Sequence, residues 1–123
     1  MAKASHNQRL SSMDANFLYI ETSRAPDAPV HRTTIWPVVD EGEVYVRSLN
    51  GEAGRWYAEA LANPEVVLHV DGEELRARAV PAADEQSVGR ATSGFQRKYA
   101  DSPYLESMVR EDILATTLRL DPR

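Results

Sequence analysis

The chain has 123 residues, of which 42% are hydrophobic and 27% charged, and its formal net charge is −5 at pH 7. This length corresponds to one globular domain with a real hydrophobic core. The acidic balance argues against a nucleic-acid binder, because 14 Lys and Arg are scattered among 19 Asp and Glu. Without cysteine there are no disulfides, thiolate metal sites or cysteine nucleophiles. No apolar run is long enough for a membrane span or a signal peptide, so we expect a cytoplasmic protein.

The first half of the chain is predicted to be mostly strand. Residues 1–15 are expected to form a tail with a short helix at Leu10–Ala15, and a single domain fills residues 16–123. Three strands are expected from alternating β-branched and aromatic residues, at Asn16–Thr22, Val30–Val39 and Glu43–Ser48. Pro37 cannot donate a ladder hydrogen bond, so it must lie at an edge or a bulge. Asp40-Glu41-Gly42 is expected to form a hairpin turn.

The second half is predicted to mix strands and helices. A short helix at Arg55–Ala62 ends at Asn63-Pro64, because a residue before proline avoids the helical conformation. Asp71-Gly72 is the strongest hairpin signal in the chain. Further strands are expected at Glu65–Val70, Glu74–Val80 and Ala115–Leu120, and further helices at Asp84–Tyr99 and from Ser102-Pro103 onward. The order predicts a mainly β, α+β fold in which six antiparallel strands curl into a small barrel with two or three short helices.

A strand end, a glycine-bearing loop and a helix start follow one another between residues 45 and 57. Their polar and glycine residues are Arg47, Ser48, Gly51, Gly54 and Arg55. Backbone N–H groups, a positive helix end, one hydroxyl and two guanidiniums together suit a phosphate or a carboxylate. An ordinary strand-to-helix connection with solvated arginines carries the same residues. Both interpretations therefore stay open.

Several motifs along the chain belong to one recognisable pattern. They are Tyr45-Val46-Arg47-Ser48, Gly51, Trp56-Tyr57 and Leu61-Ala62-Asn63-Pro64-Glu65-Val66. This set resembles the flavin and deazaflavin oxidoreductases of split-barrel fold, especially the deazaflavin-dependent nitroreductase branch. A wider set is similar to a family of small uncharacterised proteins in the same superfamily, through His31–Trp36, Gly54–Tyr57, Lys98-Tyr99, Ser102–Tyr104 and Thr116–Leu120. The similarity runs from about Phe17 to Pro122.

The resemblance implies a six-stranded antiparallel split β-barrel that forms a homodimer, with a flavin-type cofactor near the dimer interface. In such proteins the cofactor phosphate lies against the second and third strands and the start of the next helix. The matching positions are Arg32, Thr33, Thr34, Arg47, Ser48, Asn50, Gly51, Arg55 and Trp56. Leu49 departs from the pattern, because relatives that use a deazaflavin commonly have a lysine or arginine there. Asn50 and Arg55 are the residues that could compensate.

Two classes of function follow. The first is an oxidoreductase, nitroreductase-like, that binds FMN or a deazaflavin and reduces a small acceptor. The cofactor carries the hydride in such enzymes, so the sequence does not identify catalytic residues. The second is a cofactor-free dimeric barrel that binds a small anionic ligand or a protein partner. Leu49 favours the second class, and the Arg/Ser/Gly cluster favours the first.

Other chemistries find less support. The histidines His6, His31 and His69 lie far apart with no metal-binding spacing, so no metal site is expected. A hydrolase triad of Ser48, His31 and Asp40 lacks a nucleophile elbow. Arg32 lies on a half-buried strand and needs a partner, which is either a ligand anion or a carboxylate such as Glu21 or Asp40.

Overall fold

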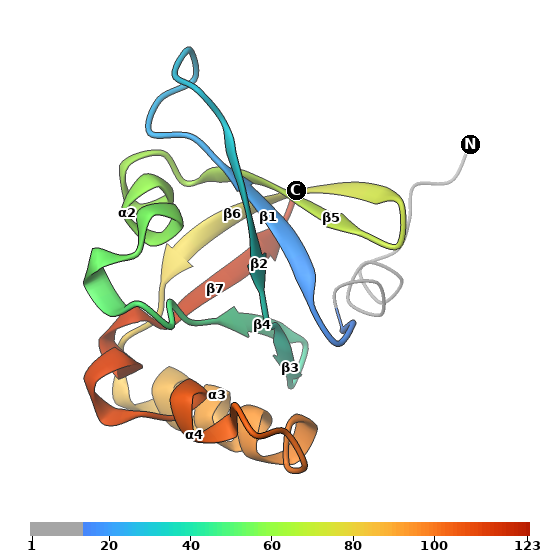
Figure 1. Cartoon of the computed structure of the whole chain (residues 1–123), viewed down its shortest axis with the longest axis vertical. Coiled ribbons are helices and arrows are strands. Elements are labelled where there is room, and N and C mark those ends of the chain that lie inside the picture. The colour runs from blue at the N-terminus through green and yellow to red at the C-terminus, as the bar shows by residue number, and fades with distance from the viewer. Residues whose placement is uncertain (1–13) are drawn as a thin grey trace.

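One antiparallel sheet of seven strands forms the body of the protein, in a computed structural model that describes residues 14–123 (Figure 1). The strands are β1 (Leu18–Thr22), β2 (His31–Ile35), β3 (Val38–Asp40), β4 (Glu43–Val46), β5 (Glu65–Val70), β6 (Glu73–Pro81) and β7 (Leu118–Pro122). Their order is β2-β1-β5-β6-β7-β4-β3. The two edge strands, β2 and β3, are joined by Trp36-Pro37 alone. The sheet therefore has to curl until its edges approach each other, which gives a split barrel.

The predicted number of six strands is wrong, because the predicted strand at Val30–Val39 divides at Pro37 into β2 and β3. β2 pairs with β1, whereas β3 pairs with β4. Pro37 has no N–H to continue a ladder. Its carbonyl oxygen instead accepts hydrogen bonds from Lys98 Nζ at 2.7 Å and Tyr99 Oη at 3.0 Å. The break thus ties the chain to the end of a later helix.

The two predicted glycine hairpins are confirmed. Glu41 and Gly42 have φ angles of 47° and 81°, and Asp71 and Gly72 have φ angles of 50° and 78°. Two consecutive positive φ angles are those of the turn whose twist matches a two-stranded hairpin. These turns fix the register of β3 with β4 and of β5 with β6.

Helix α2 (Arg55–Ala62) packs on the barrel interior, with the same bounds as predicted. It buries Trp56, Tyr57 and Ala60 against the side chains that fill the barrel. The barrel core consists of Leu18, Ile20, Ile35, Val44, Val46, Val66, Leu68, Val70, Ala77, Ala79, Leu118 and Leu120. Burying such side chains is the main stabilising contribution in a domain of this size.

A second core lies outside the barrel, where helices α3 (Glu85–Lys98) and α4 (Leu105–Met108) cover β3 and β4 (Figure 1). Its members are Val38, Tyr45, Ala82, Ala91, Phe95, Tyr99 and Met108. Gly94 lets α3 approach the sheet closely, since a Cβ there would lie 3.1 Å from Val38 Cβ. Short 3₁₀ helices, η1 (Gly51–Ala53) and η2 (Glu111–Thr116), lie beside each other at the same end.

Several predicted boundaries are corrected. The helix expected from Ser102 begins at Leu105, because Ser102 Oγ accepts from the Tyr104 N–H at 3.1 Å and holds a local turn. The last strand begins at Leu118 and not at Ala115, because the hydroxyls of the two preceding threonines donate to carbonyls within η2 at 2.7 Å. The helix predicted at Leu10–Ala15 falls mostly outside the described residues.

Candidate functional site

The structure separates the residues predicted to hold a cofactor into buried and accessible groups. Arg47, Ser48 and Trp56 are only 3%, 0% and 7% exposed. The accessible residues are Arg32, Thr33, Thr34, Asn50, Gly51 and Arg55. A ligand can reach the second group directly, so the two groups have different roles.

Arg47 is buried where β4 meets the C-terminal helical region. Its Nε donates to Thr117 Oγ1 at 2.9 Å, one terminal nitrogen donates to Met108 O at 3.1 Å, and the other donates to Val88 O at 3.0 Å and Thr92 Oγ1 at 2.8 Å. These acceptors come from α3, α4 and the chain after η2. The planar fork of guanidinium donors suits such a junction, because one side chain reaches acceptors on several elements.

The guanidinium of Arg47 also lies over the Phe95 ring, 5.2 Å from its centroid. Burial lowers the pKa of Arg47 to about 10, so the group is still charged at neutral pH. The acceptors lie 41 to 70 residues away in the chain, so the local sequence gave no sign of them. Arg47 fastens the C-terminal helices to the barrel.

Ser48 is enclosed by the loop that follows it. Its hydroxyl donates to Gly51 O at 2.7 Å, and its N–H donates to Thr116 Oγ1 at 3.1 Å. A Cβ on Gly54 would lie 2.4 Å from Ser48 Oγ, so a side chain at residue 54 does not fit. Gly51 has a φ of +64°, which favours glycine. This motif shapes the loop that leads into α2.

Arg55 begins α2 and points its charge outward. The cap residue Gly54 gives the first N–H groups of the helix no side-chain acceptor. Within residues 14–123, the Arg55 guanidinium makes no hydrogen bond or ion pair, and neither do the hydroxyls of Thr33 and Thr34. These donors are therefore available to a ligand.

Arg32 on β2 lies beside a carboxylate, Glu21, on the neighbouring strand β1. Its guanidinium lies 3.6 Å from Glu21 Oε1 and 3.3 Å from His69 Nε2. His69 in turn contacts Glu21 at 3.2 Å. Asp40, the other carboxylate considered, pairs with Arg97 at 2.9 Å. The pair with Glu21 is half exposed, so Arg32 keeps donors for further contacts.

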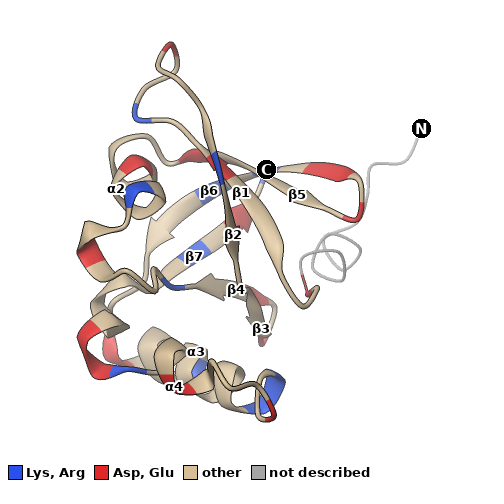
Figure 2. Ribbon diagram, in the orientation of Figure 1, with Lys and Arg blue, Asp and Glu red and all other residues tan. Residues whose placement is uncertain are grey.

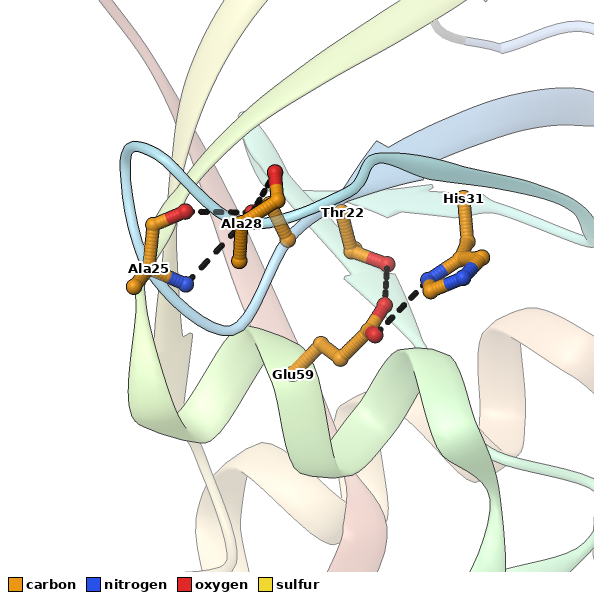
Figure 3. A network of polar contacts seen from close by, with 6 residues as sticks. Thr22, Ala25, Ala28, His31 and Glu59 are labelled. Atoms are coloured by element: carbon orange, nitrogen blue, oxygen red, sulfur yellow. Dashed lines mark hydrogen bonds and ion pairs between the residues drawn. The ribbon is translucent and has the colours of Figure 1, made fainter.

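Three elements meet in a network that the sequence did not reveal (Figure 3). Glu59 on α2 is 9% exposed and accepts from Thr22 Oγ1 on β1 at 2.8 Å. Its other oxygen lies 2.8 Å from Nδ1 of His31 on β2. Ser23 closes the adjacent loop by donating to Ala28 O at 3.1 Å. The available signal was a glutamate on the buried face of an amphipathic helix.

Arg110 is a second residue that the sequence did not reveal. Its guanidinium donates to Leu49 O at 2.9 Å, so it brings a positive group to the residue where relatives commonly have a basic side chain. It also pairs with Asp112. Figure 2 shows basic and acidic segments interspersed over the fold. In the part of the chain described, no three metal-binding side chains gather, and no helix is long and apolar enough to cross a membrane.

Several solved structures share this split-barrel architecture. Conserved hypothetical protein Rv2991 from Mycobacterium tuberculosis aligns with a TM-score of 0.71 at 16% identity, over 97% of this chain and 81% of that one. The F420-H2 dependent reductase FDR-A aligns with a TM-score of 0.64 at 14% identity, over 88% and 96%. HutZ, a heme storage protein from Vibrio cholerae, aligns with 0.62 at 12%, over 99% and 92%. At such low identities, the structural alignments establish the fold alone.

Residues 9–120 match the family described as an uncharacterised protein conserved in bacteria, DUF2255. The match spans most of the chain, so the protein belongs to this family. No curated protein matches it. The expected membership of an uncharacterised family is thereby confirmed, and the structural likeness confirms the split-barrel fold.

Proposed function

We propose that the protein binds a flavin-type cofactor, FMN or a deazaflavin, and reduces a small acceptor. The cofactor phosphate lies at the junction of β2, the η1 loop and the start of α2. The observation that carries this proposal is Arg55, whose guanidinium has no partner in residues 14–123 and which begins a helix without a side-chain cap. Relatives of the same fold include a protein named as an F420-H2 dependent reductase, which supports the cofactor class.

The accessible donors fit a phosphate. Arg55 offers a planar fork and the first turn of α2 offers backbone N–H groups, both of which favour an anion. Thr33 adds a hydroxyl from the face of β2 that contacts α2, and the loop residue Asn50 adds a side-chain amide. The N–H of Gly51 already donates to Ser48 O at 3.0 Å and closes the loop. Arg32 and Thr34 lie on the other face of β2, beside Glu21 and Tyr19 of β1, so they do not contact this phosphate.

The buried members of the predicted set act indirectly. Ser48 shapes the loop, Trp56 anchors α2 in the barrel core, and Arg47 holds the helical region behind β4. A bound flavin or deazaflavin would supply the hydride chemistry. The chain's own residues then bind the phosphate, fix the position of the cofactor and present the acceptor.

A second candidate is a cofactor-free barrel that binds a small anionic ligand or a protein partner at the same junction. Acidic residues favour it, since Glu52 lies in η1 and Glu111 and Asp112 lie in the adjacent η2. These carboxylates repel a ligand with several negative charges, such as a nucleotide-like phosphate, more strongly than they repel a ligand with a single carboxylate. Two further observations favour this second candidate: Leu49 replaces a basic residue, and the Ser48 hydroxyl bonds within its own loop.

A fluorescence titration with FMN and with F420 in low-phosphate buffer tests the proposal. We expect saturable micromolar binding of one of them, with inorganic phosphate as a competitor. Arg55→Ala should weaken binding about 10- to 100-fold, which corresponds to one charge-assisted hydrogen bond. Arg76→Ala is the matched control, because Arg76 is also exposed and unpartnered among the described residues. Binding of neither cofactor by folded protein would contradict the proposal, and carboxylate binding in its place would support the second candidate.

The proposal includes a homodimer formed through the outer face of β1. Phe17 and Tyr19 are 46% and 40% exposed there, with ring centroids 5.7 Å apart. Glu21 and Arg32 lie beside them, so two copies related by a twofold axis can pair opposite charges. A second copy would remove the aromatic pair from water. Light scattering at micromolar concentration should give a dimer that Tyr19→Glu converts to monomer, and a monomeric wild type would contradict this.

A further inference from the structure

His31 has the arrangement of a histidine oriented for proton transfer (Figure 3). Its Nδ1 lies 2.8 Å from the Glu59 carboxylate, and the side chain of Glu59 is 11% exposed. A carboxylate only accepts hydrogen bonds, so the shared proton belongs to Nδ1. The second ring nitrogen, Nε2, has no partner among the described residues, and the side chain is 35% exposed. The carboxylate thus orients the ring and leaves Nε2 available.

Glu59 is itself held in place. Its other oxygen accepts from Thr22 Oγ1 at 2.8 Å, so each oxygen has one donor, and the donors come from β1 and β2. The carboxylate cannot turn away from His31 without losing the Thr22 bond in a buried setting, which is costly. This order of base, orienting acid and supporting hydroxyl is the arrangement found where an imidazole moves protons.

His69 offers a contrast within the same sheet. Its Nε2 contacts both Glu21 and Arg32, and its Nδ1 lies 3.9 Å from Glu74. Charged neighbours therefore engage Nε2 of His69 at hydrogen-bond distance, and a further carboxylate lies near its Nδ1. The two histidines differ in whether a nitrogen is left for a substrate, and this difference marks His31 as the functional one.

The dyad also lies beside the proposed phosphate site. Arg55 and Glu59 are four residues apart on α2, so they share one face of the helix. His31 and Thr33 are two residues apart on β2, so their side chains lie on the same face of the strand. Glu59 contacts that face through His31. A ligand held by Arg55 and Thr33 therefore has His31 as its neighbour along both elements.

We propose that His31 is the general acid that protonates the acceptor, with Glu59 and Thr22 as positioning residues; this inference rests on the proposed function. A bound, reduced flavin or deazaflavin would supply the hydride, with its two electrons and one hydrogen, to the acceptor. The Nε2–H bond of the His31 imidazolium breaks, and its proton forms a bond to the acceptor's oxygen or nitrogen. The neutral imidazole regains a proton from water. The substrate class is a small molecule with a polar double bond, C=O, C=N or N=O, because an Nε2–H group stabilises negative charge on such atoms.

Acylation with diethyl pyrocarbonate tests the dyad without any cofactor. The reagent modifies an unprotonated imidazole nitrogen, and peptide mass spectrometry of the full chain gives separate rates for His31 and His69. In buffer alkaline enough to leave both imidazoles neutral, we expect His31 to react several-fold faster than His69. Glu59→Gln should slow His31, because the ring loses the carboxylate that raises its nucleophilicity, and leave His69 unchanged. Equal rates at the two histidines, or a His31 rate that ignores Glu59→Gln, would overturn the assignment.

The variant His31→Asn separates catalysis from structure. The asparagine amide keeps a donor for Glu59 and removes Nε2, so the unfolding midpoint and cofactor affinity should stay near wild type. Single-turnover reduction should slow about 10²- to 10⁴-fold, whereas the control variant His69→Asn should keep the wild-type rate. Wild-type rates in His31→Asn would sink the inference. Should the wild type bind neither cofactor, the proposed function fails and the acylation rates alone decide on His31.

Discussion

Arg47 and Arg55 lie on either side of one glycine loop, and the structure uses them in opposite ways. Arg47 is 3% exposed and bonded to four acceptors from distant parts of the chain. Arg55 is exposed and has no partner among the described residues. In sequence, both looked like parts of one phosphate clamp. The role of an arginine therefore depends on the acceptors that the fold places around it.

The largest effect is expected for Arg47→Ala. Its loss removes the guanidinium donors to Met108 O and Val88 O and opens a cavity beside Phe95. We expect the free energy of unfolding to fall by about 3–5 kcal/mol, as for a buried, multiply hydrogen-bonded charge. Urea denaturation followed by circular dichroism measures this change. A variant with wild-type stability would show that Arg47 is not the fastening residue.

Gly54→Ala is expected to have an intermediate effect at the loop between the two arginines. The new Cβ would lie 2.4 Å from Ser48 Oγ, so the loop has to shift, at about 1–3 kcal/mol. The double variant Ser48→Ala, Gly54→Ala removes the clashing oxygen. In a double-mutant cycle it should therefore be more stable than the sum of the two single losses indicates. If the stability losses of the two single variants simply add, the contact with Ser48 Oγ is not the reason that residue 54 is glycine.

The smallest effect is expected for Asp84→Asn, at the exposed start of α3. The Asp84 carboxylate accepts from the Ser87 N–H at 3.0 Å, and this bond lowers its pKa. A lowered pKa in the folded state means that the contribution is present near neutral pH and is lost as pH falls through the acidic range. The stability difference between wild type and Asp84→Asn should therefore shrink on acidification. A difference that stays constant from pH 7 to the acid transition would contradict it.

The sequence predicted correctly those turns and helices whose formation depends on residues close by in the chain. The hairpins at Gly42 and Gly72 and the bounds of α2 depend on nearby glycine and proline residues, and they agree with the structure. The number of strands failed because Pro37 ends one pairing and its carbonyl finds Lys98 and Tyr99 far along the chain. No local pattern contains such a partner.

In the candidate site, too, contacts between neighbouring strands could be predicted and contacts made by packing could not. The sequence indicated that Arg32 needs a partner, and the register of β1 with β2 supplies Glu21. It did not reveal that Glu59 would face His31, because that contact depends on how α2 crosses the barrel. Residues of a site that come from one loop could be predicted, whereas those that meet through packing could not.

The most direct test measures cofactor affinity and stability side by side in Arg55→Ala and Arg47→Lys. We predict that Arg55→Ala raises the dissociation constant for the bound flavin or deazaflavin about 10- to 100-fold with an unchanged unfolding midpoint. Arg47→Lys should lower the unfolding midpoint, because lysine lacks the planar fork, and leave the affinity of the folded protein near wild type. The reverse pattern, with affinity lost in Arg47→Lys and kept in Arg55→Ala, would contradict the assignment of the phosphate to Arg55.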